Sequence, residues 1–327
     1  MRAAMWVLGL LCAAVLIFGL AWGLGPREPV RVVSQVDAGD VPETNLSRWL
    51  DEREDETPDL RDDARKEVVW HGEEGHATVL SVVYLHGFSA SPAELRPVPD
   101  LVAAELKANL FLMRFKGHGR DGAAMAEASV GDYVDDVAEA LIVGRRLGER
   151  VLVLATSTGG AALTLALSAN PDLRRDLHGV VMMSPNFRMK ATGSALLTWP
   201  FARSFVPVLL GDSRGFDPQS ESHASHWTES YPSRALMPMA ALVKAAREAD
   251  VSGIEAPALF LVSPTDTVVS SEATREVSLR WGGAATFESW HLKPGDDPDG
   301  HVLGGRILSP GSTDALAARI DAFAGSV

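Results

Sequence analysis

Cysteine is nearly absent from this chain of 327 residues, since Cys12, in an apolar N-terminal run, is the only one. A single cysteine excludes an intrachain disulfide and a metal site built from several thiolates. The nine histidines are scattered without the spacing of metal ligands, and no phosphate-binding Walker motif is present. The sequence therefore predicts neither a metal nor another cofactor.

Positive charge is also in short supply, because 30 Lys and Arg stand against 43 Asp and Glu, a formal net charge of −13. Phosphate binding needs clustered Lys and Arg, so the composition argues against a nucleic-acid partner. Much of the acidity is local: Asp37 to Asp63 holds eleven acids and three arginines. Residues 26–65 are interpreted as an acidic linker, solvated and partly disordered, in preference to an acidic docking surface.

Charge is missing altogether from Ala3 to Pro26. The stretch Met5 to Leu24 has the length of a membrane span, about 20 residues, and exceeds the ~7–15-residue apolar core of a cleavable signal. Residues 1–25 are therefore predicted to be a single-pass membrane anchor. A signal segment cleaved near Ala21-Trp22-Gly23 is the alternative.

The basic residues around this run say little about its orientation. Arg2 and the amino terminus lie on one side, and Arg27 and Arg31 on the other, so the positive-inside rule nearly cancels. The working interpretation is an anchor that exports the C-terminal domain, which would then lie outside the cytoplasm at a membrane surface. The sequence does not determine an oligomeric state.

Beyond residue 65, short apolar runs alternate with segments of helical spacing. Strands are predicted over 68–71, 78–85, 110–114, 151–155, 179–184, 258–262 and 286–291. Helices are predicted over 91–109, 130–147, 158–169 and 313–323, the first opened by a capping box, Ser91-Pro92-Ala93-Glu94. This alternation predicts one α/β domain over 66–327 with a doubly wound, mostly parallel sheet.

One long segment, about 188–255, interrupts the alternation and greatly exceeds a usual connection between strand and helix. Its size and composition predict a cap inserted over the sheet edge where ligands bind. Ordinary packing onto the sheet is expected of most of its large apolar side chains, which are Trp199, Phe201, Phe205, Leu209, Leu210, Trp227, Tyr231, Met237 and Met239.

Residues 151–160, Val-Leu-Val-Leu-Ala-Thr-Ser-Thr-Gly-Gly, place Ser157 between the end of a buried strand and the start of a helix. On its own, a serine there could simply cap the helix. The segment also resembles the nucleophile elbow of α/β-hydrolases, G-x-S-x-G, with Ala155 in place of the first glycine. Small residues are needed around such a serine because strand and helix approach closely.

Two further loops carry the resemblance. His86-Gly87-Phe88-Ser89 is similar to the family's oxyanion loop, which implies that the backbone N–H groups of Phe88 and Thr158 hold developing negative charge, with His86 a packing residue. Lys116-Gly117-His118-Gly119-Arg120 is similar to the Gly-His-Gly loop of bacterial carboxylesterases and monoacylglycerol lipases. In most of those proteins this histidine is structural.

The resemblance also implies an acid and a base. Asp266 follows the predicted strand 258–262, where the family places its acid, although it could instead cap the next helix. His301 lies between the last strand and the last helix, where the family places its histidine. His291 is the rival, but it falls at the end of a strand, where a packing or surface role is expected.

The order Ser157, Asp266, His301 matches that of α/β-hydrolases. The resemblance implies a serine hydrolase in which these residues are nucleophile, orienting acid and base, acting through an acyl-enzyme on a small-molecule carboxylic ester of apolar or lipid-like character. A thioesterase or C–C bond hydrolase with the same triad is the alternative, and an inactive membrane-anchored scaffold is a third.

Overall fold

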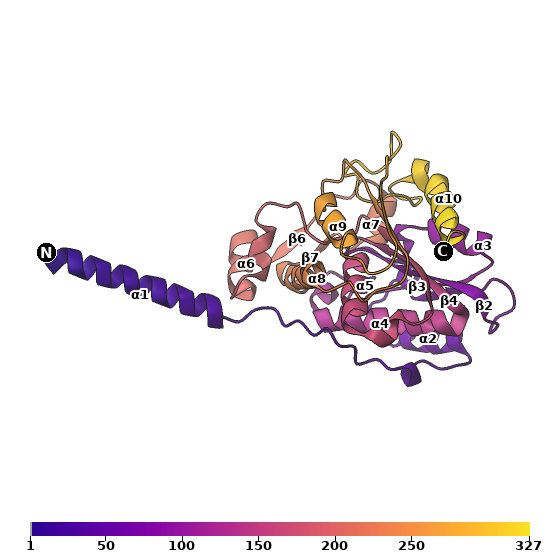
Figure 1. Ribbon diagram of the computed structural model, residues 1–327, viewed down its shortest axis with the longest axis horizontal. Helices are drawn as coiled ribbons and strands as arrows, with labels where there is room; N and C mark the ends of the chain where they lie inside the picture. The colour runs from indigo at the N-terminus through magenta and orange to yellow at the C-terminus, as the bar shows by residue number, and fades with distance from the viewer. Residues whose placement is uncertain (1) are drawn as a thin grey trace.

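A seven-stranded sheet forms the centre of the molecule in the computed structural model, which describes residues 2–327 (Figure 1). The strand order is β1-β3-β2-β4-β5-β8-β9; β1 runs antiparallel to β3, and every other neighbouring pair is parallel. This confirms the predicted mostly parallel sheet. The strands are β1 (Glu67–Val69), β2 (Thr78–Leu85), β3 (Asn109–Met113), β4 (Gly148–Thr156), β5 (Leu177–Met183), β8 (Ala258–Val262) and β9 (Ala285–Ser289).

Helices cover both faces of this sheet, so its central strands are apolar on both sides. In β2, Val83 and Leu85 join the core on one face, whereas Val82 and Tyr84 join the core on the other. The first core is covered by α4 (Val130–Leu147), α5 (Thr158–Ala169), α8 (Leu236–Glu248) and α9 (Ser271–Ser278). The second is covered by α3 (Val98–Glu105) and α10 (Thr313–Ala324), which lie side by side in Figure 1.

The helix predicted over 91–109 is shorter in the structure. A 3-10 turn covers Pro92–Glu94, and α3 begins only at Val98. The interruption has a physical cause, because Pro97 disfavours the helical conformation for the residue before it. The capping box is also wrong: Ser91 Oγ accepts a hydrogen bond from the Ala93 N–H, but the Glu94 side chain turns elsewhere.

The segment inserted after β5 contains short elements and then the long helix α8. Of the predicted cap at about 188–255, the last part is α8, which packs on α5 in the main core. We call residues 188–235 the cap. Its elements are a 3-10 turn (Ser194–Thr198), α6 (Ala202–Leu210), β6 (Ser213–Gly215), α7 (Glu221–His226), β7 (Ser230–Pro232) and a second 3-10 turn (Ser233–Ala235).

Part of the segment interpreted as an acidic linker is packed against the domain. Helix α2 (Leu46–Asp55) buries Leu46 and Leu50 in the first core. Its Glu54 forms a buried ion pair with Arg114 at 2.6 Å. The acidic composition conceals a helix with one apolar face, so this part of the segment is not a solvated connector.

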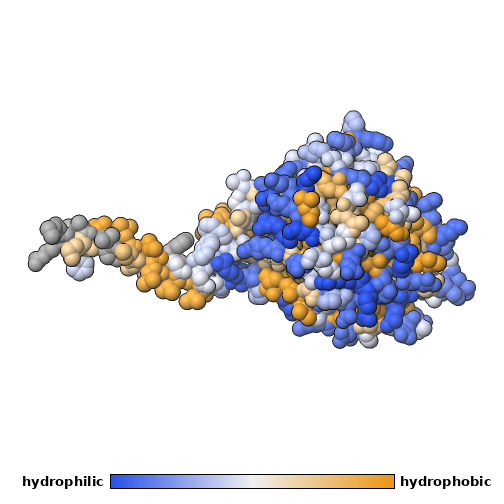
Figure 2. Space-filling model, in the orientation of Figure 1, coloured by the Kyte–Doolittle hydropathy of each residue, from blue (hydrophilic) through white to orange (hydrophobic). Residues whose placement is uncertain are grey.

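Helix α1 (Arg2–Leu24) extends away from the domain in Figure 1, and Figure 2 shows a largely hydrophilic visible face on the domain itself. In the part of the chain that the structure describes, no helix combines the length and apolar character needed to cross a membrane. This finding contradicts the predicted single-pass anchor and the membrane localisation inferred from it. The prediction rested on an uncharged run in the sequence, and lack of charge does not by itself establish a span.

Candidate active site

Ser157 occupies a strained turn between the end of β4 and the start of α5. Its φ of 51° and ψ of −118° are unusual for a residue with a side chain. The turn is held by hydrogen bonds, since the Ser157 N–H donates to the Met183 carbonyl at 3.0 Å and the Ser157 carbonyl accepts from Asn186 N–H at 2.9 Å. Strain persists only where the surroundings enforce it, and here the end of β5 and the loop that follows it do so.

Glycine follows this turn because α5 begins against the backbone of β2. A Cβ added to Gly159 would lie 2.5 Å from the Leu85 carbonyl oxygen and 2.6 Å from that of His86. Neither oxygen can move without shifting the sheet. The small residues that the sequence pattern requires are therefore required by packing as well.

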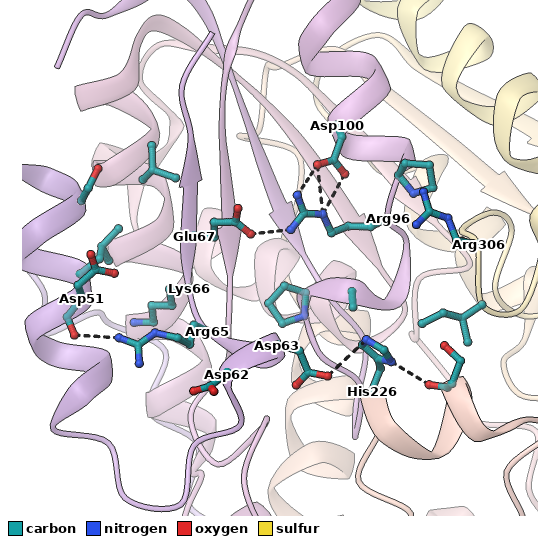
Figure 3. Close-up of a pocket in the computed structure, with 18 residues that line it drawn as sticks. Asp51, Asp62, Asp63, Arg65, Lys66, Glu67, Arg96, Asp100, His226 and Arg306 are labelled. Carbon is teal, nitrogen blue, oxygen red and sulfur yellow. Dashed lines mark hydrogen bonds and ion pairs between the residues drawn. The ribbon is translucent and has the colours of Figure 1, made fainter. Parts of the chain in front are cut away.

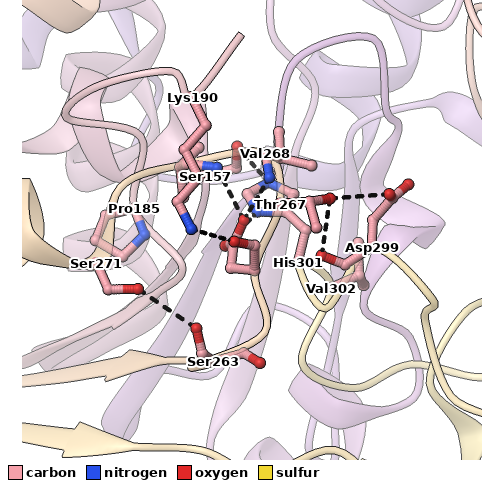
Figure 4. Close-up of polar contacts among 12 residues, drawn as sticks. Ser157, Pro185, Lys190, Ser263, Thr267, Val268, Ser271, Asp299, His301 and Val302 are labelled. Atoms are coloured by element: carbon pink, nitrogen blue, oxygen red, sulfur yellow. Dashed lines mark hydrogen bonds and ion pairs between the residues drawn. The ribbon is translucent and has the colours of Figure 1, made fainter.

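Ser157, His301 and Asp266 lie in one continuous chain of hydrogen bonds. Ser157 Oγ is 2.9 Å from His301 Nε2; both residues are labelled in Figure 4. His301 Nδ1 is 2.9 Å from Asp266 Oδ2. The other carboxylate oxygen of Asp266 accepts the N–H groups of Val268 and Val269 at 2.7 and 2.8 Å. Three loops that are distant in sequence thus meet beyond the carboxyl ends of β4 and β8.

The loop that carries His301 is organised by a second acid, Asp297. Its buried carboxylate accepts the N–H of His301 at 2.9 Å and that of Val302 at 2.8 Å. Sequence reasoning missed this residue. The available signal was an aspartate four residues before the histidine in an Asp-Pro-Asp-Gly turn, since aspartate side chains often accept nearby backbone N–H groups.

Electrostatics favour a proton on His301. Burial by itself would lower the pKa of His301, but the hydrogen bond to Asp266 and the negative charges of Asp266, Glu94 and Asp297 outweigh it and raise that pKa. An imidazole in this setting can accept the hydroxyl proton of Ser157 and be stabilised as imidazolium.

The two candidate oxyanion donors flank Ser157. Thr158 is the first residue of α5, where backbone N–H groups have no acceptor within the helix. Phe88 follows β2 in a loop that closely approaches the serine, because a Cβ added to Gly87 would lie 3.2 Å from Ser157 Cβ. Their role as donors stays a prediction.

The remaining histidines of the matched motifs have structural surroundings. His86 is fully buried; its Nδ1–H donates to the Gly87 carbonyl, and its Nε2 accepts from Phe115 N–H. His118 is buried beside the Lys116 carbonyl, and burial lowers its pKa to about 4. His291 is exposed after β9. None of the three occupies the place between Ser157 and Asp266.

An apolar cavity of about 310 Å³ lies within the cap. Two contacts connect its lining to the loops around Ser157. Tyr231 meets the Phe88 ring edge-on at 5.2 Å, and Met189 pairs with Val269, whose N–H binds Asp266. Most of the lining is apolar: Met189, Leu196, Leu197, Phe205, Val206, Leu209, Leu210, Tyr231 and Leu236.

A larger cavity of about 790 Å³ lies between α2, β1 and α7 and contains none of the three aligned residues (Figure 3). Some of its charged side chains are paired with one another, as Arg96 is with Glu67 and Asp100. Within residues 2–327, no group of three or more His, Cys, Asp or Glu side chains is placed to hold a metal ion.

The sheet order, the turn at Ser157 and the positions of the acid and histidine loops define an α/β-hydrolase. A family model described as serine aminopeptidase S33 matches residues 78–287, well over half of the chain, and the chain belongs to this family. The resemblance to α/β-hydrolases inferred from the sequence is thereby confirmed. A search of curated proteins found no match.

Similar solved structures include lipases and esterases. A structure from work on LipS and LipT, metagenome-derived lipolytic enzymes, is 19% identical with a TM-score of 0.65, covering 82% of this chain and all of that one. Monoacylglycerol lipase of Paleococcus ferrophilus is 15% identical with a TM-score of 0.57, covering 80% and 98%. Monoglyceride lipase of Saccharomyces cerevisiae is 10% identical with a TM-score of 0.57, covering 80% and 91%. At these identities the likeness establishes the fold.

Proposed function

We propose that this hydrolase cleaves carboxylic esters through an acyl-enzyme, with Ser157 as nucleophile, His301 as base and Asp266 as orienting acid. The observation that carries the proposal is the unbroken hydrogen-bonded chain, at 2.9 Å for each link, from Ser157 Oγ through His301 to Asp266. Serine becomes nucleophilic when an adjacent base accepts its proton and a third group orients that base. The hydrogen-bonded chain supports this assignment because it supplies a serine, an adjacent base and a group that orients the base.

The mechanism follows from the atoms. His301 Nε2 takes the hydroxyl proton as Ser157 Oγ attacks the ester carbonyl, and the Phe88 and Thr158 N–H groups bind the oxyanion. His301 then gives the proton to the departing alcohol as the C–O bond breaks. Water attacks the acyl-enzyme with His301 again as base, and Ser157 is regenerated as the acid leaves.

We assign the apolar cavity in the cap to one hydrophobic part of the ester, either its acyl chain or its alcohol. The lining offers many carbon atoms and few polar partners, so a chain of methylene groups gains about 0.8 kcal/mol per buried group. The similar structures of lipases agree with this assignment. An oxygen ester is preferred to a thioester only by those likenesses, because the same three residues serve both.

Replacement of the nucleophile tests the proposal. Ser157→Ala should reduce hydrolysis of p-nitrophenyl esters to below about 1% of wild type, because it removes the group that forms the acyl-enzyme. Ser168→Ala, at a serine of α5 whose hydroxyl donates to the Leu165 carbonyl, is the matched control. Equal activity of Ser157→Ala and wild type would refute the assignment, and no turnover by wild-type protein would favour an inactive scaffold.

A chain-length series tests the cavity. Leu196, a half-buried residue of its lining, can be enlarged to tryptophan to fill it. Leu196→Trp should lower kcat/KM for decanoyl esters about tenfold or more and leave acetyl esters nearly unchanged, because only the longer chain needs the space. Leu279→Trp, at a residue 78% exposed, is the control. Equal effects on both esters would remove the cavity from the proposal. Paired oxygen esters and thioesters of the same acyl group would separate the two chemistries.

A further inference from the structure

Glu94 is a buried carboxylate that contacts the Gly87 loop next to Ser157. It is only 3% exposed, and its Oε2 accepts the Gly87 N–H at 2.8 Å and the Tyr84 hydroxyl at 2.6 Å. Its other oxygen, Oε1, would lie 2.8 Å from a Cβ added to Gly87, the same position that lies 3.2 Å from Ser157 Cβ. The carboxylate therefore lies against the oxyanion loop, on the side of the serine.

The hydrogen bonds of Glu94 link the two segments that supply the candidate oxyanion donors. Gly87 directly precedes Phe88, so fixing the Gly87 N–H restrains the peptide plane that follows. The hydroxyl oxygen of Tyr84 lies 3.3 Å from Thr156 Oγ1, and Thr156 directly precedes Ser157. One side chain thus connects the loop after β2 with the elbow after β4.

The charge of Glu94 lacks the compensation that other buried glutamates have. Three glutamates are buried among the described residues, and two of them are paired with cations: Glu54 with Arg114, and Glu139 with Lys66 and Arg53. Among residues 2–327, no Lys or Arg forms an ion pair with Glu94. A buried carboxylate without a cation is costly.

The basic group near Glu94 is His301, since its Nε2 lies 2.9 Å from the Oγ of Ser157 and Ser157 borders the same Gly87 loop as Glu94. Burial raises the pKa of Glu94, and the negative charge of Asp297 raises it further. The hydrogen bonds from Tyr84 and Gly87 and the positive charge of His301 lower this pKa, but burial outweighs them. From the side of His301, the acids that raise its pKa are Asp266, Glu94 and Asp297. The positive charge that can offset Glu94 is therefore the imidazolium formed during the proposed reaction.

We infer that Glu94 is a positioning residue of the proposed hydrolysis: it holds the Gly87–Phe88 loop against the elbow and places a negative charge that stabilises the imidazolium of His301. The inference rests on the proposed function. Two variants separate its parts. Glu94→Gln keeps an acceptor for Gly87 and Tyr84 but removes the charge, whereas Glu94→Ala removes both.

The test measures kcat and KM for an ester, and the rate at which a fluorophosphonate labels Ser157, over about pH 5 to 9. Glu94→Gln should move the acidic limb of both profiles to lower pH by roughly 0.5–1 unit, because the imidazolium loses a stabilising charge. Glu94→Ala should in addition lower the plateau of kcat about tenfold or more, with KM little changed, because the oxyanion loop is released.

Glu139→Gln is the matched control, since Glu139 is also buried but lies on α4 with Lys66 and Arg53. It should leave both the limb and the plateau unchanged. The inference is overturned if Glu94→Gln does not shift the acidic limb of the pH profile, or if Glu94→Ala does not lower the plateau of kcat. If the alanine variant does not fold, the pH profile of Glu94→Gln alone decides the test. Wild-type protein that resists labelling refutes the proposed function itself, whereas labelled wild type with unaltered variants refutes only the role of Glu94.

Discussion

Replacing Asp266 by asparagine tests the orienting role of this residue with almost no change of shape. Oδ1 of Asp266 accepts two backbone N–H groups, from Val268 and Val269, at 2.7 and 2.8 Å. The asparagine carbonyl oxygen should keep those bonds, so the new NH₂ group faces His301 Nδ1. Because NH₂ donates, Nδ1 becomes an acceptor and the proton moves to Nε2.

In that tautomer His301 donates to Ser157 and can no longer accept its proton. The corresponding change in serine proteases lowers kcat by about 10⁴, which equals roughly 5.4 kcal/mol in the activation barrier. We expect a loss of that order for Asp266→Asn, measured as kcat with an activated ester.

The control for this variant is Asp299→Asn, which removes an exposed carboxylate bonded to the Thr267 hydroxyl from the neighbouring loop. It should retain nearly full activity, and both variants should show thermal unfolding close to that of wild type. Asp266→Asn with more than about one-tenth of wild-type kcat would refute the orienting role. Such activity would show that catalysis does not depend on Asp266 keeping the proton of His301 on Nδ1.

Three further predictions follow from the same contacts. Activity should rise with pH through a midpoint above 6.5, because His301 must be neutral to act as a base and its pKa is raised, so the active form is lost as pH falls through that pKa. Gly159→Ala should lower Tm and reduce fluorophosphonate labelling at least ~100-fold, because the new Cβ would lie 2.5 Å from a strand carbonyl oxygen. Arg114→Ala should lower the free energy of unfolding in urea by about 3–5 kcal/mol, because Glu54 is left buried without its partner.

Each of these has its own control or contrary result. Gly39→Ala adds a Cβ with nothing within 4 Å and should leave Tm and labelling unchanged. Arg48→Ala breaks an exposed pair with Glu52 and should change the free energy of unfolding by less than about 1 kcal/mol. A midpoint at or below 6.5 would show that burial, and not Asp266, dominates the pKa of His301.

The sheet was predictable because its strands are buried on both faces and appear in the sequence as short apolar runs. The range predicted over 78–85 is β2, and that over 258–262 is β8, residue for residue. Ser157, Asp266 and His301 each follow a predicted strand, and the structure brings them together as that position predicts. Their catalytic roles stay predictions.

What the sequence did not reveal depends on contacts between distant segments. Ser91-Pro92-Ala93-Glu94 has the pattern of a capping box, yet Glu94 bonds backward to Gly87 and Tyr84, and local spacing cannot distinguish these outcomes. The sequence pattern also does not distinguish α8 from the shorter elements before it, whereas the packing of α8 on α5 does. The length of an uncharged run likewise led to an anchor that the structure does not support.

The most direct test of the central claim is to identify the residue that carries a covalent adduct after treatment with a fluorophosphonate. Mass spectrometry of the digested protein should find the adduct on Ser157, and Asp266→Asn or replacement of His301 should slow its formation by orders of magnitude. An adduct on another residue, or labelling of Ser157 at an equal rate without His301, would contradict the account.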